Sequence, residues 1–216
     1  MKMKYKIALF FICLLGTPFP VWAQCATYKK IPFVQVNINY GKIFYDNTKS
    51  NKEFPMEKYD KRVNGLTHCE FRSSAEIRPF VKPIGKNQYC VGIEKLVVDM
   101  GFPKIDVFIE KKYKPGTCNY TVVKNHENYH VRVQQEGLKF FSGKLKKAYQ
   151  LAANKVEPRL VTSESEAQNA LRDMMGQIAK ATQPTVSYIS EQLKIKNKAI
   201  DTDESYAAET KKCPTW

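Results

Sequence analysis

The feature that most constrains the fold is a change of hydrophobic period at Pro115 and Gly116. Before this point apolar and polar residues alternate, as in FVQVNIN at 33–39 and again in later stretches at 75–81, 89–98 and 104–113. Alternation with period two is typical of strands with one buried face, whereas the longer period after residue 116 is typical of amphipathic helices. A strand-rich part (24–115) followed by a helix-rich part (116–216) predicts a single α+β domain.

The spacing within each part predicts individual elements. Tyr40 and Gly41 separate FVQVNIN from KIFY and predict a β-hairpin, and the polar stretch 46–62 predicts a long loop. Thr162 or Ser163 is expected to cap a helix that begins at Glu164. The remaining helical expectations are segments at 119–135, 138–154 and 185–196 and a short turn in the C-terminal tail, held by Cys213.

The first 23 residues have the layout of a secretory signal peptide, with cleavage expected after Ala23. Three lysines precede an apolar run at 7–15 that is too short to span a bilayer. No later segment approaches the roughly 20 apolar residues that a membrane helix needs. We therefore expect a secreted or periplasmic protein without a transmembrane segment in its mature form.

The chain is strongly basic, with a formal net charge of +14. The predicted signal peptide contributes Lys2, Lys4 and Lys6 and no acidic residue, so the mature chain carries +11. Such a surplus favours encounter with anionic components of a cell envelope, although a solvated cationic face is the simpler explanation of the charge. Nucleic-acid binding is not indicated, because the sequence has no recognised motif or aromatic platform for it.

Five cysteines follow Ala23, at positions 25, 69, 90, 118 and 213. In an exported chain they predict disulfides before metal ligands, because the compartment is oxidising. An odd number means that at least one thiol is free or pairs between molecules. Spacing does not fix the connectivity; our prediction joins Cys69 to Cys90 and Cys118 to Cys213.

The chemical motif of the sequence is HENYH at 126–130, within a segment expected to be helical. On a helix His126 and His130 project side by side, so both can bind one metal ion. Glu127 points about 100° further round, away from the ion but close enough to take a proton from a zinc-activated water. The alternative is a pair of surface histidines on an amphipathic helix.

Through His126, Glu127 and His130 the chain resembles the zincin metallopeptidases. It is also similar to small bacterial secreted proteins that are predicted to be zinc proteases, over about residues 104–170. Four neighbours fit the extended motif and two depart from it: Val123, Asn128, Tyr129 and Val131 fit, and Lys124 and Arg132 depart. The resemblance implies a Zn²⁺ cofactor, Glu127 as general base, a peptide or protein substrate, and an edge strand KIDVFIEKKY that leads into the active-site helix.

The gluzincin branch of this resemblance implies a glutamate on a later helix as third metal ligand. Glu166, followed by Ala167 and Gln168, matches that position, with Glu164 and His68 as alternatives. The implied function is a secreted or periplasmic zinc-dependent hydrolase, most simply a peptidase. The alternative is a non-catalytic, disulfide-stabilised, basic envelope binding or assembly protein that retains a zinc-site helix.

Overall fold

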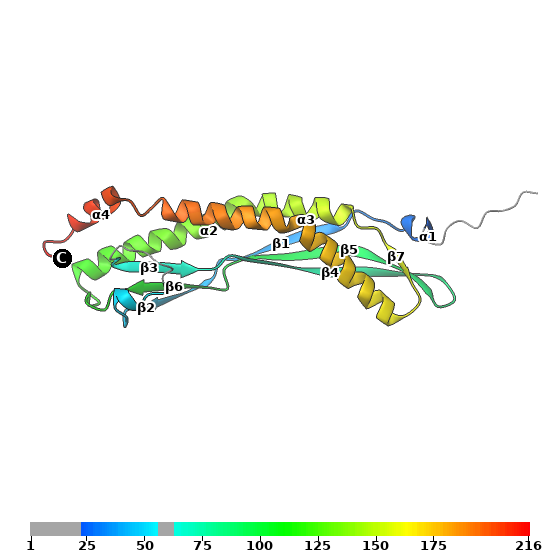
Figure 1. The fold of residues 1–216 in the computed structure, drawn as a ribbon, viewed down its shortest axis with the longest axis horizontal. Coiled ribbons are helices and arrows are strands. Elements are labelled where there is room, and N and C mark those ends of the chain that lie inside the picture. The colour runs from blue at the N-terminus through cyan, green and yellow to red at the C-terminus, as the bar shows by residue number, and fades with distance from the viewer. Residues whose placement is uncertain (1–22, 56–62) are drawn as a thin grey trace, which may run out of the picture.

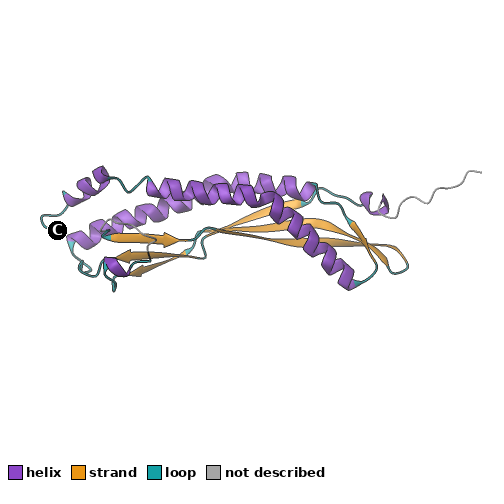
Figure 2. Ribbon diagram, viewed as in Figure 1, coloured by secondary structure: helices purple, strands orange, loops and turns teal. Residues whose placement is uncertain are grey.

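A computed structural model describes residues 23–55 and 63–216, so nearly all of the predicted signal peptide and part of the predicted loop lie outside the described residues. The strands come mainly first and the long helices afterwards, which confirms the α+β prediction (Figures 1 and 2). The elements in chain order are α1 (Ala23–Ala26), β1 (Phe33–Asn39), β2 (Lys42–Asp46), the 3-10 helix η1 (Asn51–Glu53), β3 (Gly65–Cys69), β4 (Arg72–Gly85), β5 (Gln88–Gly101), β6 (Lys104–Ile109), α2 (Cys118–Asn154), β7 (Arg159–Val161), α3 (Glu164–Lys198) and α4 (Asp203–Thr210).

The strands form two sheets that lie end to end in an elongated molecule (Figure 1). The larger has the order β1-β5-β4, with β7 also paired to β5, and the smaller has the order β2-β6-β3. The predicted hairpin of β1 and β2 is wrong, because β1 runs parallel to β5 and β2 parallel to β6. The chain does not reverse at Gly41. It continues from β1 into β2 alongside the chain that runs from β5 into β6, and Phe102 N donates to Asn39 O at 3.0 Å where the two segments leave the larger sheet.

The prediction that KIDVFIEKKY forms an edge strand is also wrong. Its strand, β6, is the central strand of the smaller sheet, and β3 is the edge strand on the side of α2. Strand β6 contributes Ile105, Val107 and Ile109, all of which are fully buried. It is central because β2 pairs with it in parallel on one side and β3 pairs with it antiparallel on the other.

The long helices are each continuous where the sequence predicted breaks. Helix α2 has 37 residues and passes through Gly137, which lies directly under Leu193 of α3. Helix α3 has 35 residues and contains Pro184, and Figure 1 shows it bent along its length. Proline removes one helical hydrogen bond and bends a helix without ending it when packing holds both halves. The predicted cap is confirmed, since the Ser163 side chain accepts from Glu166 N.

The core lies between the larger sheet and the two long helices, which cover one face of it (Figure 2). Strand β5 supplies Leu96, Val98 and Met100, which alternate with more exposed residues as one-sided burial requires. The main helical partners in this cluster are Leu138, Phe141, Leu145, Met174, Ile178 and Ile189. Among the described residues, no helix is long and apolar enough to cross a bilayer.

Two disulfides are present, Cys25–Cys90 and Cys118–Cys213, and the second confirms its prediction. The predicted Cys69–Cys90 bridge is wrong. Cys90 lies at the start of β5 in the larger sheet, and Cys69 pairs opposite Ile105 in the smaller one. The run of β5 from Cys90 to Gly101 alone spans on the order of 35 Å, far beyond disulfide reach. Cys69 is a free, partly buried thiol whose pKa burial raises to about 12.

Candidate metal centre

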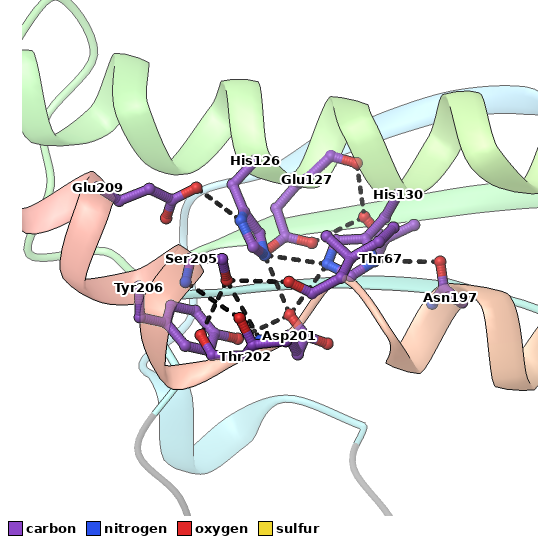
Figure 3. A network of polar contacts seen from close by, with 11 residues as sticks. Thr67, His126, Glu127, His130, Asn197, Asp201, Thr202, Ser205, Tyr206 and Glu209 are labelled. Atoms are coloured by element: carbon purple, nitrogen blue, oxygen red, sulfur yellow. Dashed lines mark hydrogen bonds and ion pairs between the residues drawn. The ribbon is translucent and has the colours of Figure 1, made fainter.

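Three parts of the fold meet around the HENYH segment. Helix α2 supplies His126, Glu127 and His130, all of them buried, and the edge strand β3 lies against the same stretch of α2. The third part is the chain from the end of α3 through α4, which folds across the two histidines (Figure 3). The Cys118–Cys213 bridge ties this C-terminal stretch back to the first residue of α2.

Three donor atoms converge at this point. The Nε2 atoms of His126 and His130 are 3.0 Å apart, and each lies close to Asp201 Oδ1, at 3.0 Å and 3.1 Å respectively. The histidines meet because residues four apart share one face of a helix. Asp201 joins them because it follows α3 by three residues, and α3 packs beside α2 (Figure 3).

This triangle fits a tetrahedral divalent ion. Four ligands at about 2.05 Å from zinc are about 3.3 Å from one another, so the three atoms need to separate by only about 0.3 Å to admit the ion. Two imidazoles and one carboxylate leave a fourth position open, as in catalytic rather than structural zinc sites. Within residues 23–55 and 63–216 this is the one group of three or more such side chains whose donor atoms lie together.

Both imidazoles are held through their other ring nitrogen. His126 Nδ1 lies 2.6 Å from Glu209 Oε1, and His130 Nδ1 lies 3.0 Å from Asn197 Oδ1. With the hydrogen on Nδ1, each ring donates to these oxygens and turns Nε2 toward Asp201. Metal-binding histidines are oriented in this way by an acceptor behind the ring.

Tyr206 secures the carboxylate of the triangle. Its hydroxyl donates to Asp201 Oδ1 at 2.8 Å, and its ring stacks on His126 with centroids 5.4 Å apart and planes at 27°. Helix α4 therefore contacts the site twice, through Tyr206 near its middle and Glu209 near its end.

The electrostatics of the site favour a positive charge between these groups. Burial disfavours a charged His126, but the Asp201 bond and the carboxylates of Glu127 and Glu209 outweigh it and raise its pKa to about 9. The pKa of His130 is raised in the same way. Burial works against the Asp201 carboxylate, yet its bonds to both histidines hold its pKa well below the ordinary value. The carboxylates that raise the pKa of both imidazoles would equally favour a cation between these groups.

Glu127 lies beside the triangle and contacts β3. Thr67 Oγ1 donates to Glu127 Oε2 at 2.8 Å and also to the Glu127 backbone carbonyl at 3.1 Å. Burial raises the pKa of Glu127 to about 6, although both histidines and Thr67 lower it. Gly65 makes room for this carboxylate, since a Cβ at that position would lie 2.5 Å from Glu127 Oε1.

The structure does not bring Glu166 to the histidines. Glu166 is in the first turn of α3, and its Oε2 accepts from Thr162 N at 2.7 Å and from Thr162 Oγ1 at 2.9 Å. Asn197, which contacts His130, is 31 residues further along the same helix, on the order of 45 Å away if the helix were straight. Glu166 is therefore a helix cap, and Asp201 replaces it as the candidate third ligand.

The two alternatives for that ligand are also elsewhere. Glu164 is exposed at the start of α3, and His68 is exposed on β3, opposite Asp106. The sequence did not predict Asp201, Asn197, Tyr206 or Glu209 as site residues. The signal that could have found Asp201 is the acidic stretch DTDE at 201–204, which is separated by four residues from the helix predicted at 185–196.

A groove of about 910 Å³ lies beside the site, between α2 and the chain that follows α3. Of the three residues of the triangle, only His126 lines it, and Tyr129, Phe140, Lys196 and Lys212 are among the other lining residues. The groove therefore reaches the triangle at the His126 side.

Comparison with known proteins identified no relative of this chain. No family model matches the chain, and neither curated proteins nor solved structures give a match. The likeness to zincins thus depends on His126, Glu127, His130 and the geometry around them.

Proposed function

We propose that this protein is a zinc-dependent hydrolase of the cell exterior or periplasm and that it cleaves peptide bonds. The observation that carries the proposal is the triangle of His126 Nε2, His130 Nε2 and Asp201 Oδ1, with atoms 3.0–3.1 Å apart and the Glu127 carboxylate adjacent. Two disulfides support an oxidising compartment. The net positive charge favours substrates in or near anionic envelope components.

Each residue has a distinct part in this proposal. His126, His130 and Asp201 would hold the ion, and a bound zinc supplies a Lewis acid that acidifies water and polarises a carbonyl. Glu127 would accept the proton of the attacking water and pass it to the leaving amine. Thr67 holds one carboxylate oxygen of Glu127 and so fixes which way the group points. Among the described residues β3 is an edge strand, and an edge strand can pair with an extended peptide.

The test is metal analysis combined with a Glu127→Gln variant. The wild-type protein should contain about one zinc per chain and cleave members of a peptide library. A chelator should abolish this cleavage, and added zinc should restore it. Glu127→Gln keeps the shape of the side chain but removes the base, so it should retain zinc and lose turnover by a factor of about 100 or more. Equal turnover in both proteins would refute Glu127 as the base.

The second candidate is a non-catalytic envelope binding or assembly protein stabilised by the metal and the disulfides. The observation in its favour is the C-terminal chain, which lies across the histidines and leaves the described groove in contact with His126 alone among the three donors. Stoichiometric zinc without turnover in the wild type would support this candidate over the hydrolase.

A further inference from the structure

Glu209 contacts a buried histidine although its own helix, α4, is not buried. Helix α4 has eight residues and none of them is buried, so packing alone does little to fix it. Even so, Glu209 Oε1 lies 2.6 Å from His126 Nδ1, a ring that is itself buried. Something other than apolar packing must hold the end of α4 against α2.

The Cys118–Cys213 bridge is the main connection at this end. Cys213 comes four residues after Glu209 and is buried, and its partner Cys118 is the first residue of α2, two helical turns before His126. Two weaker contacts lie next to it: Asn119 Nδ2 donates to Thr215 O at 2.7 Å, and the Trp216 ring meets Tyr113 edge-on at 5.8 Å.

Asp201 is held differently. It follows α3 by three residues, and α3 is anchored nearby because Leu193 is buried against Gly137 of α2. The backbone of the third ligand therefore stays in place through helix packing, with a further side-chain bond from Tyr206 of α4, whereas Glu209 depends on the bridge. The bridge thus acts on the site mainly through His126, which both Glu209 and Tyr206 contact.

We propose that Glu209 is a positioning residue for His126 and that the Cys118–Cys213 bridge holds it there, so that full metal affinity requires the oxidised protein. The inference rests on the proposed metal site. Its chemical step is thiol–disulfide exchange with a dithiol reductant. The reductant supplies two electrons and two hydrogens, the sulfur–sulfur bond breaks, Cys118 and Cys213 become thiols, and the reductant closes into its own disulfide.

The consequence is a metal site that assembles fully only after the bridge has formed. Loss of an acceptor behind a metal-binding histidine costs about 10-fold to 100-fold in metal affinity. A chain in a reducing compartment would therefore bind zinc more weakly by that factor, and its site would reach full affinity in the compartment where disulfides persist.

The first experiment needs no metal. In metal-free protein the Nδ1–H of His126, shielded by Glu209, should give a resolved downfield proton signal with slow exchange. Glu209→Gln should weaken this signal, and Cys118→Ser/Cys213→Ser should broaden or remove it, because the acceptor is then no longer held. The matched control is Glu204→Gln, an exposed acid on the same helix, which should leave the signal unchanged. A signal that persists in the bridge variant would overturn the proposal.

The second experiment is a double-mutant cycle on zinc affinity, measured by competition with a chromogenic chelator. Glu209→Gln and the bridge variant should each weaken binding about 10-fold to 100-fold. In the Glu209→Gln background, removal of the bridge should weaken zinc binding by a smaller factor than it does in the wild-type background, because the Glu209 contact is already lost and only the Tyr206 contacts can still be weakened. Additive losses would overturn the proposal. Circular dichroism checks that each variant keeps its helices.

The outcomes separate this inference from the proposed function. If wild-type protein binds no zinc, the hydrolase proposal fails, and the His126 proton signal still decides whether the bridge positions Glu209. If zinc binds and the signal does not depend on Glu209, the positioning role fails and the metal site stands.

Discussion

Asp201 completes the candidate site because one carboxylate oxygen lies within 3.1 Å of both histidine nitrogens. The same oxygen also accepts from Tyr206. These three donors concentrate around a single atom, which accounts for the strongly lowered pKa of Asp201. A carboxylate held ionised in this way is suited to bind a divalent cation.

The ligand assignment predicts opposite results for two acidic residues. Asp201→Asn should weaken zinc binding by more than the 10-fold to 100-fold typical of residues behind a ligand. Glu166→Gln should leave zinc affinity unchanged, because Glu166 caps the far end of α3. Titration of both variants with zinc against a competing chelator measures this, and a loss confined to Glu166→Gln would reinstate Glu166 as the ligand.

The sequence predicted the site residues that lie close together in the chain. His126, Glu127 and His130 lie within five residues of one helix, so their relative directions follow from helix geometry. Asp201 is 71 residues after His130, and its proximity depends on where α3 ends and on how α3 packs against α2. No spacing rule contains that information.

Among the elements, α2 and α3 decide the position of the site by packing closely at Gly137. Gly137 is buried in the middle of α2, and an added Cβ there would lie 2.4 Å from Leu193 Cδ2. The absence of a side chain brings the end of α3, with Asn197 and Asp201, next to the histidines. Glycine weakens a helix, but at this position it permits close contact between α2 and α3.

Two glycines of α2 should therefore respond in opposite ways to alanine. Gly143→Ala should stabilise the protein by about 0.5–1 kcal/mol, because the position is exposed, nothing lies within 4 Å, and alanine favours helix. Gly137→Ala should destabilise it by about 1–2 kcal/mol, since overpacking against Leu193 exceeds the same gain. Urea unfolding of the three proteins measures both changes, and a stabilising Gly137→Ala would show that α3 does not pack as closely as described.

Alternation of apolar and polar residues predicted where the strands are but not how they pair. Alternation correctly placed β1, β4, β5 and β6, because each has one face in the core. It did not reveal that β1 and β2 pair with β5 and β6 in parallel, nor that β6 is central. Pairing depends on contacts between residues far apart in the chain, and a period within one strand carries no trace of them.

At the scale of the whole molecule, the two disulfides secure different regions. Cys25–Cys90 attaches the N-terminal stretch to the start of β5, beside β7, whereas Cys118–Cys213 closes the C-terminal stretch over the candidate metal centre. Figure 1 shows α1 and α4 at opposite ends of the elongated fold. One bridge therefore lies far from the candidate metal centre, and the other lies beside it.

Removal of the two bridges should separate these effects. Cys25→Ser/Cys90→Ser should lower the free energy of unfolding by about 2–4 kcal/mol, because the bridge closes a long segment in the unfolded chain. It should leave zinc affinity unchanged, in contrast to loss of Cys118–Cys213. Chemical unfolding and zinc titration on both variants measure the two quantities. Equal losses of zinc affinity would mean that the bridges act through general destabilisation.

The sequence alone predicted the α+β class, the HENYH helix with its paired histidines and the helix cap at Ser163. These depend on periodicity, helix geometry and local capping. The tertiary contacts were needed to show that Asp201 and not Glu166 meets the histidines, that Cys25 and not Cys69 joins Cys90, and that Glu209 and Asn197 lie within hydrogen-bond distance of the two Nδ1 atoms. The physical reason is shared: each depends on how two packed helices and two sheets laid end to end bring distant segments together.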